Sequence, residues 1–171
     1  MKRILIIGSS GSGKSTIAKK IGEILSFPFV SLDQCYWQPG WKSPEKSGWR
    51  KKVLELIKTD RWILEGNYKS TLDIIAPATD AIIFLDINRS VCLWRVFKRR
   101  ILKDRIDKLN NCEEKVSLKL IRNILLEYPQ ERKPRALELL KKHSNKKIII
   151  IKSNKDIKKL LEKYQGAKLH L

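Results

Sequence analysis

The residues with the clearest chemical signature stand near the start of the chain, where glycines and serines precede a lysine. The segment reads Gly8-Ser9-Ser10-Gly11-Ser12-Gly13-Lys14-Ser15 and matches the pattern G-x-x-x-x-G-K-[ST] in full. Glycine lets a backbone curl around an anion, so that successive N–H groups point inward. We therefore predict a phosphate-binding loop, in which Lys14 contacts the β- and γ-phosphates of a nucleotide and the Ser15 hydroxyl binds Mg²⁺.

The residues on either side of this segment supply the elements that such a loop requires. An apolar run over 2–7 predicts a buried strand, and Ile17 and Ile21 recur at helical spacing within 14–25. The N-terminus of that helix adds partial positive charge to the loop, and Thr16 lies in its first turn. A chance Gly/Ser-rich turn does not require the lysine and the serine at these offsets. The pattern therefore favours a nucleotide with Mg²⁺, and it leaves ATP and GTP both open.

Strands and helices alternate along the rest of the chain. We expect strands at 2–7, 29–32, 62–64, 81–87 and 147–151. We expect helices at 14–25, from Ser43-Pro44 to 58, after Ser90 as a cap, and at 114–128, 134–143 and 155–164. This alternation predicts an α/β fold with a parallel sheet, in one domain that spans 1–171.

The composition restricts the class of protein and of partner. The net charge is +19, and residues 89–147 alone hold 18 Lys and Arg against seven Asp and Glu. Such a bias attracts nucleotides, phosphorylated substrates, nucleic acid or acidic membrane, although it also suits a solvated surface with no partner. The apolar run at 4–7 is shorter than a signal peptide or a membrane span needs, which favours the cytoplasm. The three cysteines lack the spacing of a metal site, so we expect free thiols.

Longer pieces of the chain are more specific than the loop. They read Leu32-Asp33-Gln34-Cys35-Tyr36-Trp37-Gln38-Pro39-Gly40-Trp41, Trp62-Ile63-Leu64-Glu65-Gly66-Asn67-Tyr68, Leu85-Asp86-Ile87-Asn88-Arg89, Trp94-Arg95-Val96-Phe97-Lys98-Arg99-Arg100 and a basic stretch at 128–135. With these pieces the chain resembles the adenylate-kinase-like nucleoside and nucleotide kinases, and among them the small DNA topology modulation (FlaR-like) proteins. The resemblance implies the three-layer P-loop NTPase fold, with a five-stranded parallel sheet in the order 2-3-1-4-5 and a short helical lid near 102–128.

The resemblance also assigns a metal-binding acid. In such kinases an acid at the end of the third strand holds Mg²⁺ through water, and Glu65 falls at that position. Aspartate is usual there, so the glutamate departs from the family's pattern. Asp86, after the longer apolar run of the fourth strand, is the competing candidate. The implied strand order puts the second and third strands beside the phosphate loop, and we therefore prefer Glu65.

Asp33 ends the second strand, on the side where these kinases hold the acceptor or the water around Mg²⁺. A carboxylate facing the transferred group orients or deprotonates an acceptor hydroxyl. The alternative is that Asp33 caps a helix or a turn. Lys69 falls where adenylate kinases place a basic residue that holds the acceptor phosphate, although it also suits a solvated surface.

Two arginines, Arg95 and Arg99, are four residues apart and therefore share one face of the expected helix. The resemblance implies that Arg95 stacks on the base and Arg99 contacts the phosphates, under a lid near 102–113. Guanidinium suits both roles, because it is planar and forks onto phosphate oxygens. Arg122, Arg132 and Arg135 are further candidates to close on the transferring group. The alternative for all five is a solvated basic helix face.

Three aromatic residues, Tyr36, Trp37 and Trp41, crowd the loop that follows Asp33. They suit stacking on an acceptor ring, and equally a local core that holds down the helix over 44–58. Aromatic rings beside a basic surface also hold single-stranded nucleic acid. The sequence thus predicts phosphoryl transfer from Mg²⁺-ATP to a small molecule, with a nucleotide-regulated DNA-binding protein, or an ATPase without an acceptor, as alternatives.

Overall fold

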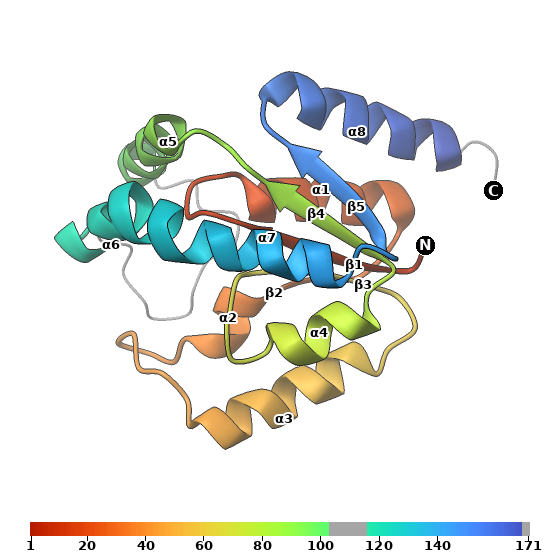
Figure 1. The fold of residues 1–171 in the computed structure, drawn as a ribbon, viewed down its shortest axis with the longest axis horizontal. Helices are drawn as coiled ribbons and strands as arrows, with labels where there is room; N and C mark the ends of the chain where they lie inside the picture. The colour runs from red at the N-terminus through yellow and green to blue at the C-terminus, as the bar shows by residue number, and fades with distance from the viewer. Residues whose placement is uncertain (103–115, 169–171) are drawn as a thin grey trace.

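The computed structural model describes residues 1–102 and 116–168. Its centre is a five-stranded parallel sheet in the order β2-β3-β1-β4-β5 (Figure 1). The strands are β1 (Arg3–Gly8), β2 (Phe29–Ser31), β3 (Trp62–Glu65), β4 (Ala81–Leu85) and β5 (Lys147–Ile151). The helices are α1 (Lys14–Leu25), α2 (Leu32–Tyr36), α3 (Lys46–Ile57), α4 (Leu72–Ala78), α5 (Arg89–Leu102), α6 (Leu118–Arg122), the π-helix η1 (Asn123–Arg132), α7 (Lys133–Lys142) and α8 (Asn154–Lys168). The predicted α/β class and strand order are confirmed.

Helices cover both faces of the sheet, which makes three layers. Ile4 and Ile6 on β1 pack toward α1, α5 and α8, whereas Leu5 and Ile7 pack toward α3, α4 and α7. Successive side chains of a strand point to opposite faces, so a continuous apolar run is what a strand covered on both faces requires. All four residues are fully buried. Since parallel strands bring their carboxyl ends to one edge, the segments after β1, β2 and β3 meet there.

Three local predictions were wrong, and each has a physical reason. The helix expected from Ser43-Pro44 begins at Lys46 with Glu45 as its N-cap, because the preceding loop is closed by a bridge between Gln38 and Lys42. Two short helices, α2 and α4, were not predicted, since five and seven residues are too few for a periodic pattern.

The third correction concerns the break expected between the helices at 114–128 and 134–143. The structure instead shows one continuous helical run through α6, η1 and α7. Pro129 lacks an N–H group, and the run widens into π-type turns around it, where the Lys133 N–H donates to the Tyr128 carbonyl. Of the lid predicted near 102–128, residues 103–115 lie outside the described residues, while its remainder ends α5 at 102 and forms α6 and the first part of η1. No helix in the described ranges is both long and apolar enough to cross a membrane.

Candidate active site

The predicted phosphate loop joins β1 to α1 and is shaped by glycine. Gly11 and Gly13 have φ angles of 77° and 97°, in the left-handed region that side chains disfavour. A Cβ atom at Gly11 would lie 2.2 Å from the Cys92 carbonyl oxygen of α5. The loop therefore packs against the backbone of α5 so closely that only glycine fits at this point.

The loop carries polar groups that suit a bound phosphate. The hydroxyl oxygens of Ser9 and Ser12 are buried and have no hydrogen-bond partner within residues 1–102 and 116–168. The Lys14 ammonium bends back and donates to the Ser9 carbonyl oxygen at 3.0 Å. Buried hydroxyls usually have partners, so these residues, with the lysine beside them and the N-terminus of α1 behind them, fit a phosphate group.

The metal-site residues predicted from sequence lie together. The Ser15 hydroxyl donates to Glu65 Oε1 at 3.0 Å, and the Ser31 hydroxyl donates to the same oxygen at 2.7 Å. Glu65 is 1% exposed, and it pairs in register with Ser31 of β2 and Ile6 of β1. A buried carboxylate next to the predicted Mg²⁺-binding hydroxyl is the arrangement that a water-bridged magnesium requires. The described part of the chain holds no group of three His, Cys, Asp or Glu side chains placed to bind a metal ion.

Asp86, the competing acid, has a different environment. Its carboxylate forms an ion pair with Lys133 of α7 at 2.6 Å, and its N–H donates to the Ile151 carbonyl of β5. These contacts attach it to the β4–β5 side of the sheet. Glu65 instead accepts a hydrogen bond from Ser15 of the phosphate loop.

Asp33 lies in the first turn of α2, two residues after Ser31. Its Oδ1 accepts a hydrogen bond from the Tyr68 hydroxyl at 2.5 Å. Burial, and then the neighbouring Asp33 carboxylate, raise the pKa of Tyr68 far above its ordinary value. The phenol therefore keeps its proton and acts as a donor at any physiological pH.

The aromatic loop packs on its neighbours rather than standing open. The Tyr36 ring centroid lies 5.0 Å from Trp49 of α3 and 4.5 Å from Tyr68, and Trp37 lies 5.3 Å from Trp41. Tyr36 thus holds α2 against α3, as in a local core, whereas Trp41 is 39% exposed and leaves stacking on an acceptor open.

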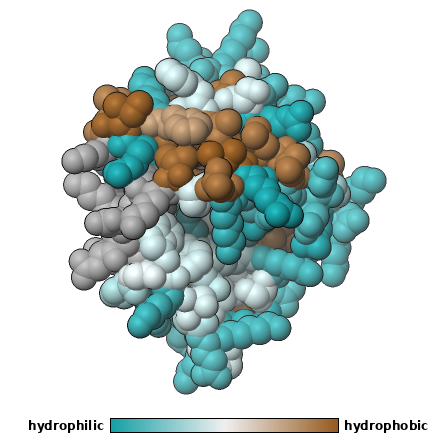
Figure 2. Space-filling view, turned by 90° about the vertical axis from the view of Figure 1, so that its left-hand side faces the viewer, coloured by the Kyte–Doolittle hydropathy of each residue, from teal (hydrophilic) through white to brown (hydrophobic). Residues whose placement is uncertain are grey.

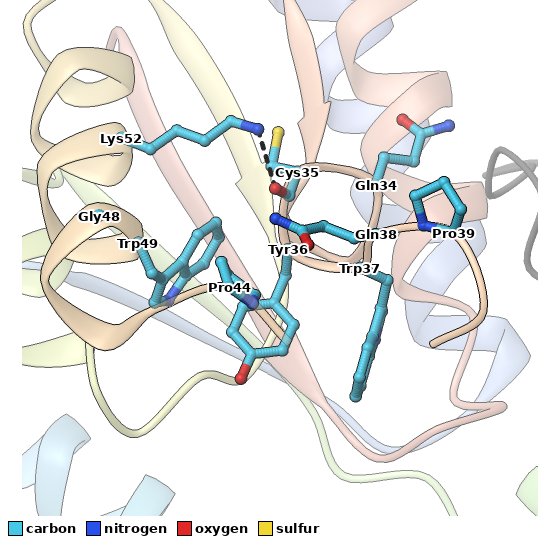
Figure 3. Close-up of a pocket in the computed structure, with 10 residues that line it drawn as sticks. All are labelled: Gln34, Cys35, Tyr36, Trp37, Gln38, Pro39, Pro44, Gly48, Trp49 and Lys52. Atoms are coloured by element: carbon cyan, nitrogen blue, oxygen red, sulfur yellow. Dashed lines mark hydrogen bonds between the residues drawn. The ribbon is translucent and has the colours of Figure 1, made fainter. Parts of the chain in front are cut away.

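A cavity of about 370 Å³ lies beside these rings (Figure 3). Trp37 and Trp49 contribute to its lining, and at one side Lys52 donates to the Cys35 carbonyl at 2.9 Å. Neither Asp33 nor any residue of the phosphate loop lines this cavity. The cavity therefore neighbours the reacting groups without containing them.

Arg95 links the phosphate loop to the first residue of α8. Its guanidinium donates to the Ser12 carbonyl at 2.9 Å and to the Asn154 side-chain oxygen, at the start of α8, at 2.7 Å. Arg99 lies one turn further along α5 and is half-buried. The outer face of α5 exposes Trp94 and Ile101, and Figure 2 shows apolar side chains gathered over this side of the molecule. Arg95 itself is only partly exposed, and its guanidinium is engaged by Ser12 and Asn154.

The remaining cations predicted from sequence are exposed. Arg122 pairs with Glu127 at 3.5 Å, and Arg135 pairs with Glu131 at 3.7 Å. Lys69 and Arg132 are exposed as well. Among the contacts of the described residues, no hydrogen bond or ion pair joins any of these four cations to the phosphate loop.

Sequence reasoning missed four residues that shape the site, namely Ser31, Tyr68, Cys92 and Asn154. Tyr68 stands at the end of the Glu-Gly-Asn-Tyr piece, which marks the residue as noteworthy. Nothing in the sequence indicates that its hydroxyl contacts Asp33. Ser31 precedes Leu-Asp, and its role depends on the pairing of β2 with β3.

No known protein-family model and no curated protein matches the sequence. Solved structures do match in fold. A shikimate kinase from Acinetobacter baumannii in complex with shikimate is 15% identical, with a TM-score of 0.65 over 99% of this chain and 94% of that one. A putative kinase from Chloroflexus aurantiacus j-10-fl is 13% identical, with a TM-score of 0.55 over 100% of both chains. A gluconokinase from Sinorhizobium meliloti 1021 is 15% identical, with a TM-score of 0.53 over 99% of this chain and 92% of that one. The chain thus has the fold of P-loop kinases.

Proposed function

We propose that this protein is a kinase that transfers a phosphoryl group from Mg²⁺-ATP to a hydroxyl of a small molecule. One observation carries the proposal: Glu65 accepts hydrogen bonds from both Ser15 and Ser31, and Asp33 follows Ser31 by two residues, at the carboxyl end of β2. A nucleotide-and-metal site therefore adjoins a carboxylate suited to an attacking hydroxyl. An ATPase would use such a carboxylate on water, so the two functions are distinguished by a panel of acceptors.

On the nucleotide side, the loop from Gly8 to Gly13 would surround the phosphates with N–H groups and with the Ser9, Ser10 and Ser12 residues. Lys14 would exchange its Ser9 carbonyl partner for phosphate oxygens. The Ser15 hydroxyl and Glu65 would hold the metal, Glu65 through water, and Thr16 would face the phosphates from the first turn of α1. Bound Mg²⁺-ATP supplies the phosphoryl group and the metal's charge.

Arginines supply positive charge where phosphoryl transfer spreads negative charge over oxygen atoms. Arg95 is already fixed between Ser12 and Asn154, where it would flank the base. Arg99 follows it by one turn on the same face of α5. We propose that Arg135, at the start of α7 and near the Lys133–Asp86 pair, approaches the transferring group from the opposite side.

On the acceptor side, Asp33 would orient or deprotonate the attacking hydroxyl. The support is its position at the end of β2, next to the metal-site residues, and its fixed orientation toward Tyr68. The adjacent aromatic rings suit an acceptor with a ring or a carbon skeleton to cover.

The fold neighbours support the same function class, since they include a shikimate kinase and a gluconokinase. The Tyr-Trp-Gln-Pro-Gly-Trp and Glu-Gly-Asn-Tyr pieces support a finer placement near the DNA topology modulation proteins. With this function we place the protein in the cytoplasm, where ATP and small metabolites are present.

A panel of nucleosides, nucleotides, sugars and hydroxy acids, incubated with γ-labelled ATP and Mg²⁺, tests the proposal. We expect label to move to at least one acceptor, at a rate that depends on both Lys14 and Asp33. Label that moves only to water, at the same rate with every acceptor, would contradict it.

A second candidate, a nucleotide-regulated DNA-binding protein, rests on the net charge of +19. Each phosphate that a protein neutralises releases counterion, so non-specific binding falls steeply with salt. Affinity for duplex and single-stranded DNA should therefore be measured at low and near-physiological salt, with and without Mg²⁺-ATP. The kinase proposal predicts loss of binding at the higher salt. Submicromolar binding that survives salt and responds to ATP would favour the second candidate.

A further inference from the structure

The Tyr68 hydroxyl makes one of the shortest side-chain hydrogen bonds near the site, at 2.5 Å to Asp33 Oδ1. Thirty-five residues separate the two in sequence, so the contact depends on how β2 and β3 bring their carboxyl ends together. We infer that Tyr68 is a positioning residue for phosphoryl transfer, whose hydroxyl fixes the direction of the Asp33 carboxylate toward the acceptor. This inference rests on the proposed function.

The ring of Tyr68 is held from two helices. Its centroid lies 4.5 Å from Tyr36 of α2 and 5.3 Å from Trp49 of α3, and Trp49 is 2% exposed. Tyr36 and Trp49 also contact each other, at 5.0 Å. A ring enclosed in this way has few alternative rotamers, so its hydroxyl stays at one place.

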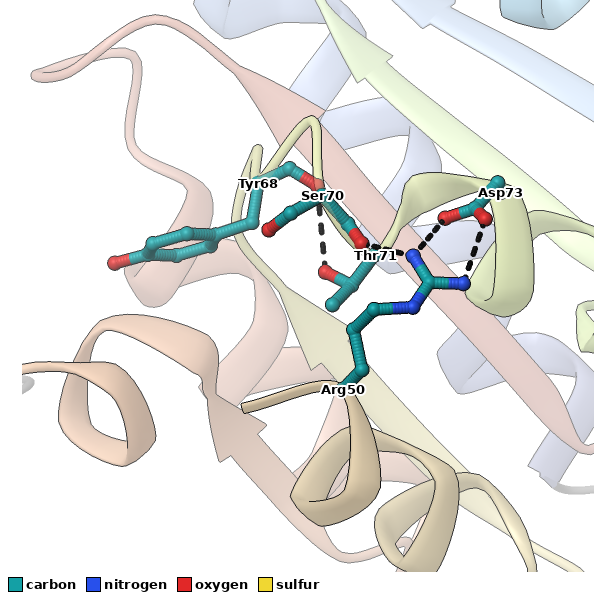
Figure 4. A network of polar contacts seen from close by, with 5 residues as sticks. All are labelled: Arg50, Tyr68, Ser70, Thr71 and Asp73. Carbon is teal, nitrogen blue, oxygen red and sulfur yellow. Dashed lines mark hydrogen bonds and ion pairs between the residues drawn. The ribbon is translucent and has the colours of Figure 1, made fainter. Parts of the chain in front are cut away.

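The backbone of Tyr68 is held as firmly as its ring. The Thr71 and Leu72 N–H groups donate to the Tyr68 carbonyl at 3.0 and 3.1 Å. Arg50 of α3 donates to the Ser70 carbonyl and forks onto the Asp73 carboxylate, at 3.0 and 2.8 Å (Figure 4). A forked guanidinium fixes geometry better than a single hydrogen bond does. Arg50 thus connects α3 both to the segment that carries Tyr68 and to the first turn of α4.

Gly66 brings this segment next to α2. A Cβ atom at Gly66 would lie 2.8 Å from Leu32 Cβ, and Leu32 immediately precedes Asp33. The Gly66 φ angle of 146° adds to the strain that a side chain would meet. Three residues of the sequence Glu-Gly-Asn-Tyr therefore have separate roles in the proposed site. The buried glutamate would bind the metal, the glycine allows close approach to α2, and the tyrosine hydroxyl contacts Asp33.

The chemistry of the tyrosine suits this role. A phenol donates one hydrogen bond and carries no charge while it keeps its proton. A lysine at this place would instead add a positive charge beside the carboxylate. Tyr68 therefore orients Asp33 without adding a charge to the site.

The test is Tyr68→Phe, which keeps the ring and removes the hydroxyl. Tyr164→Phe is the control, because the Tyr164 hydroxyl is buried but has no hydrogen-bond partner among the described residues. Hydrogen bonds to charged groups correspond to about a 10- to 100-fold effect. We expect Tyr68→Phe to lower kcat by that factor and to leave ATP affinity within about twofold. Tyr164→Phe should leave both unchanged.

A double-mutant cycle separates positioning from packing. In an Asp33→Asn background, Tyr68→Phe should have no further effect on kcat, because the group that it positions has been neutralised. An equal loss of kcat in both backgrounds, or an unchanged kcat in the single variant, would overturn the inference.

A spectroscopic measurement distinguishes failure of this inference from failure of the proposed function. The ¹³C resonance of the Asp33 carboxyl, measured at one pH near neutrality, should move in Tyr68→Phe and stay in place in Tyr164→Phe, because only the first variant removes a hydrogen bond to this carboxylate. This holds even if no acceptor is ever phosphorylated, since it depends only on the hydrogen bond. An unchanged Asp33 resonance in Tyr68→Phe would overturn the inference whatever the activity.

Discussion

The phosphate loop and the acceptor side of the site differ in what holds them. The loop is held by backbone: Gly11 packs on the Cys92 carbonyl, and Arg95 reaches the Ser12 carbonyl. The acceptor side is held by side chains from separate elements, since Asp33 depends on Tyr68, and Tyr68 on α2 and α3. The first arrangement depends on shape, whereas the second depends on particular functional groups.

This difference predicts two kinds of mutational effect. Changes at the glycines of the loop should impair nucleotide binding or folding, because the backbone itself forms the site there. Changes on the acceptor side should impair turnover with little effect on nucleotide affinity. A glycine variant that lowers only turnover, or an acceptor-side variant that lowers nucleotide affinity, would argue against this difference between the two regions.

The largest effect is expected from Lys14→Ala. The ammonium is partly exposed and bonds only to the Ser9 carbonyl among the described residues, so its loss should leave the fold intact. We expect triphosphate-dependent turnover to fall about 1,000-fold or more, because charge that stabilises the transferring group is lost. Lys58→Ala, which removes an exposed partner of Glu55, is the control. Turnover within a few-fold of wild type would disprove the phosphate-loop assignment.

Asp33→Asn should have the next largest effect, and it should be confined to turnover. General-base residues contribute about 100- to 10,000-fold, and we expect kcat to fall within that range while ATP affinity changes little. Calorimetry and steady-state kinetics on the same samples measure the two quantities. Asp60→Asn, in an exposed pair with Lys2, serves as the control. If ATP affinity fell and turnover of bound nucleotide did not, Asp33 would belong to the nucleotide half.

Gly11→Ala tests the loop as a packing device. The added methyl would meet the Cys92 carbonyl, and overpacking of this kind costs about 1–3 kcal/mol. Gly40→Ala is a sharp control, because Gly40 has a similar φ of 74° but nothing within 4 Å of the added atom. Denaturant unfolding should show the larger loss at Gly11, together with weaker nucleotide binding. Equal losses would mean that φ strain, and not contact with α5, explains the glycine.

The smallest effect is expected from Arg135→Ala. The side chain is exposed and pairs with Glu131, so it can contribute only by moving toward the site. We expect kcat to fall about three- to tenfold with stability unchanged. Arg122→Ala, which removes a similar exposed pair, provides a comparison on the same helical run. Identical kinetics for wild type and Arg135→Ala would remove this residue from the proposed site.

The nucleotide half of the site could be anticipated from sequence, because Gly8 to Ser15 are consecutive and their types define the loop. The pairing of Ser15 with Glu65 was within reach once the strand order was expected. The Asp33–Tyr68 contact was not, since it depends on ring packing between α2 and α3 that no spacing encodes.

Short and irregular helices were the other features that the sequence did not predict. Helical periodicity requires several turns, so the five residues of α2 escaped notice although they carry Asp33. Proline at 129 indicated a break, yet the surrounding helix accommodates it by widening. In both places the surrounding packing overrides the local pattern.

The most direct test of the central claim is ³¹P NMR of one reaction mixture that contains the wild-type protein, Mg²⁺-ATP and a responsive acceptor from the panel. The account predicts one phosphorylated acceptor for each ADP formed, and little ADP when the acceptor is omitted. ADP and inorganic phosphate formed at the same rate with and without acceptor would contradict it, because the phosphoryl group would then pass to water and not to the acceptor.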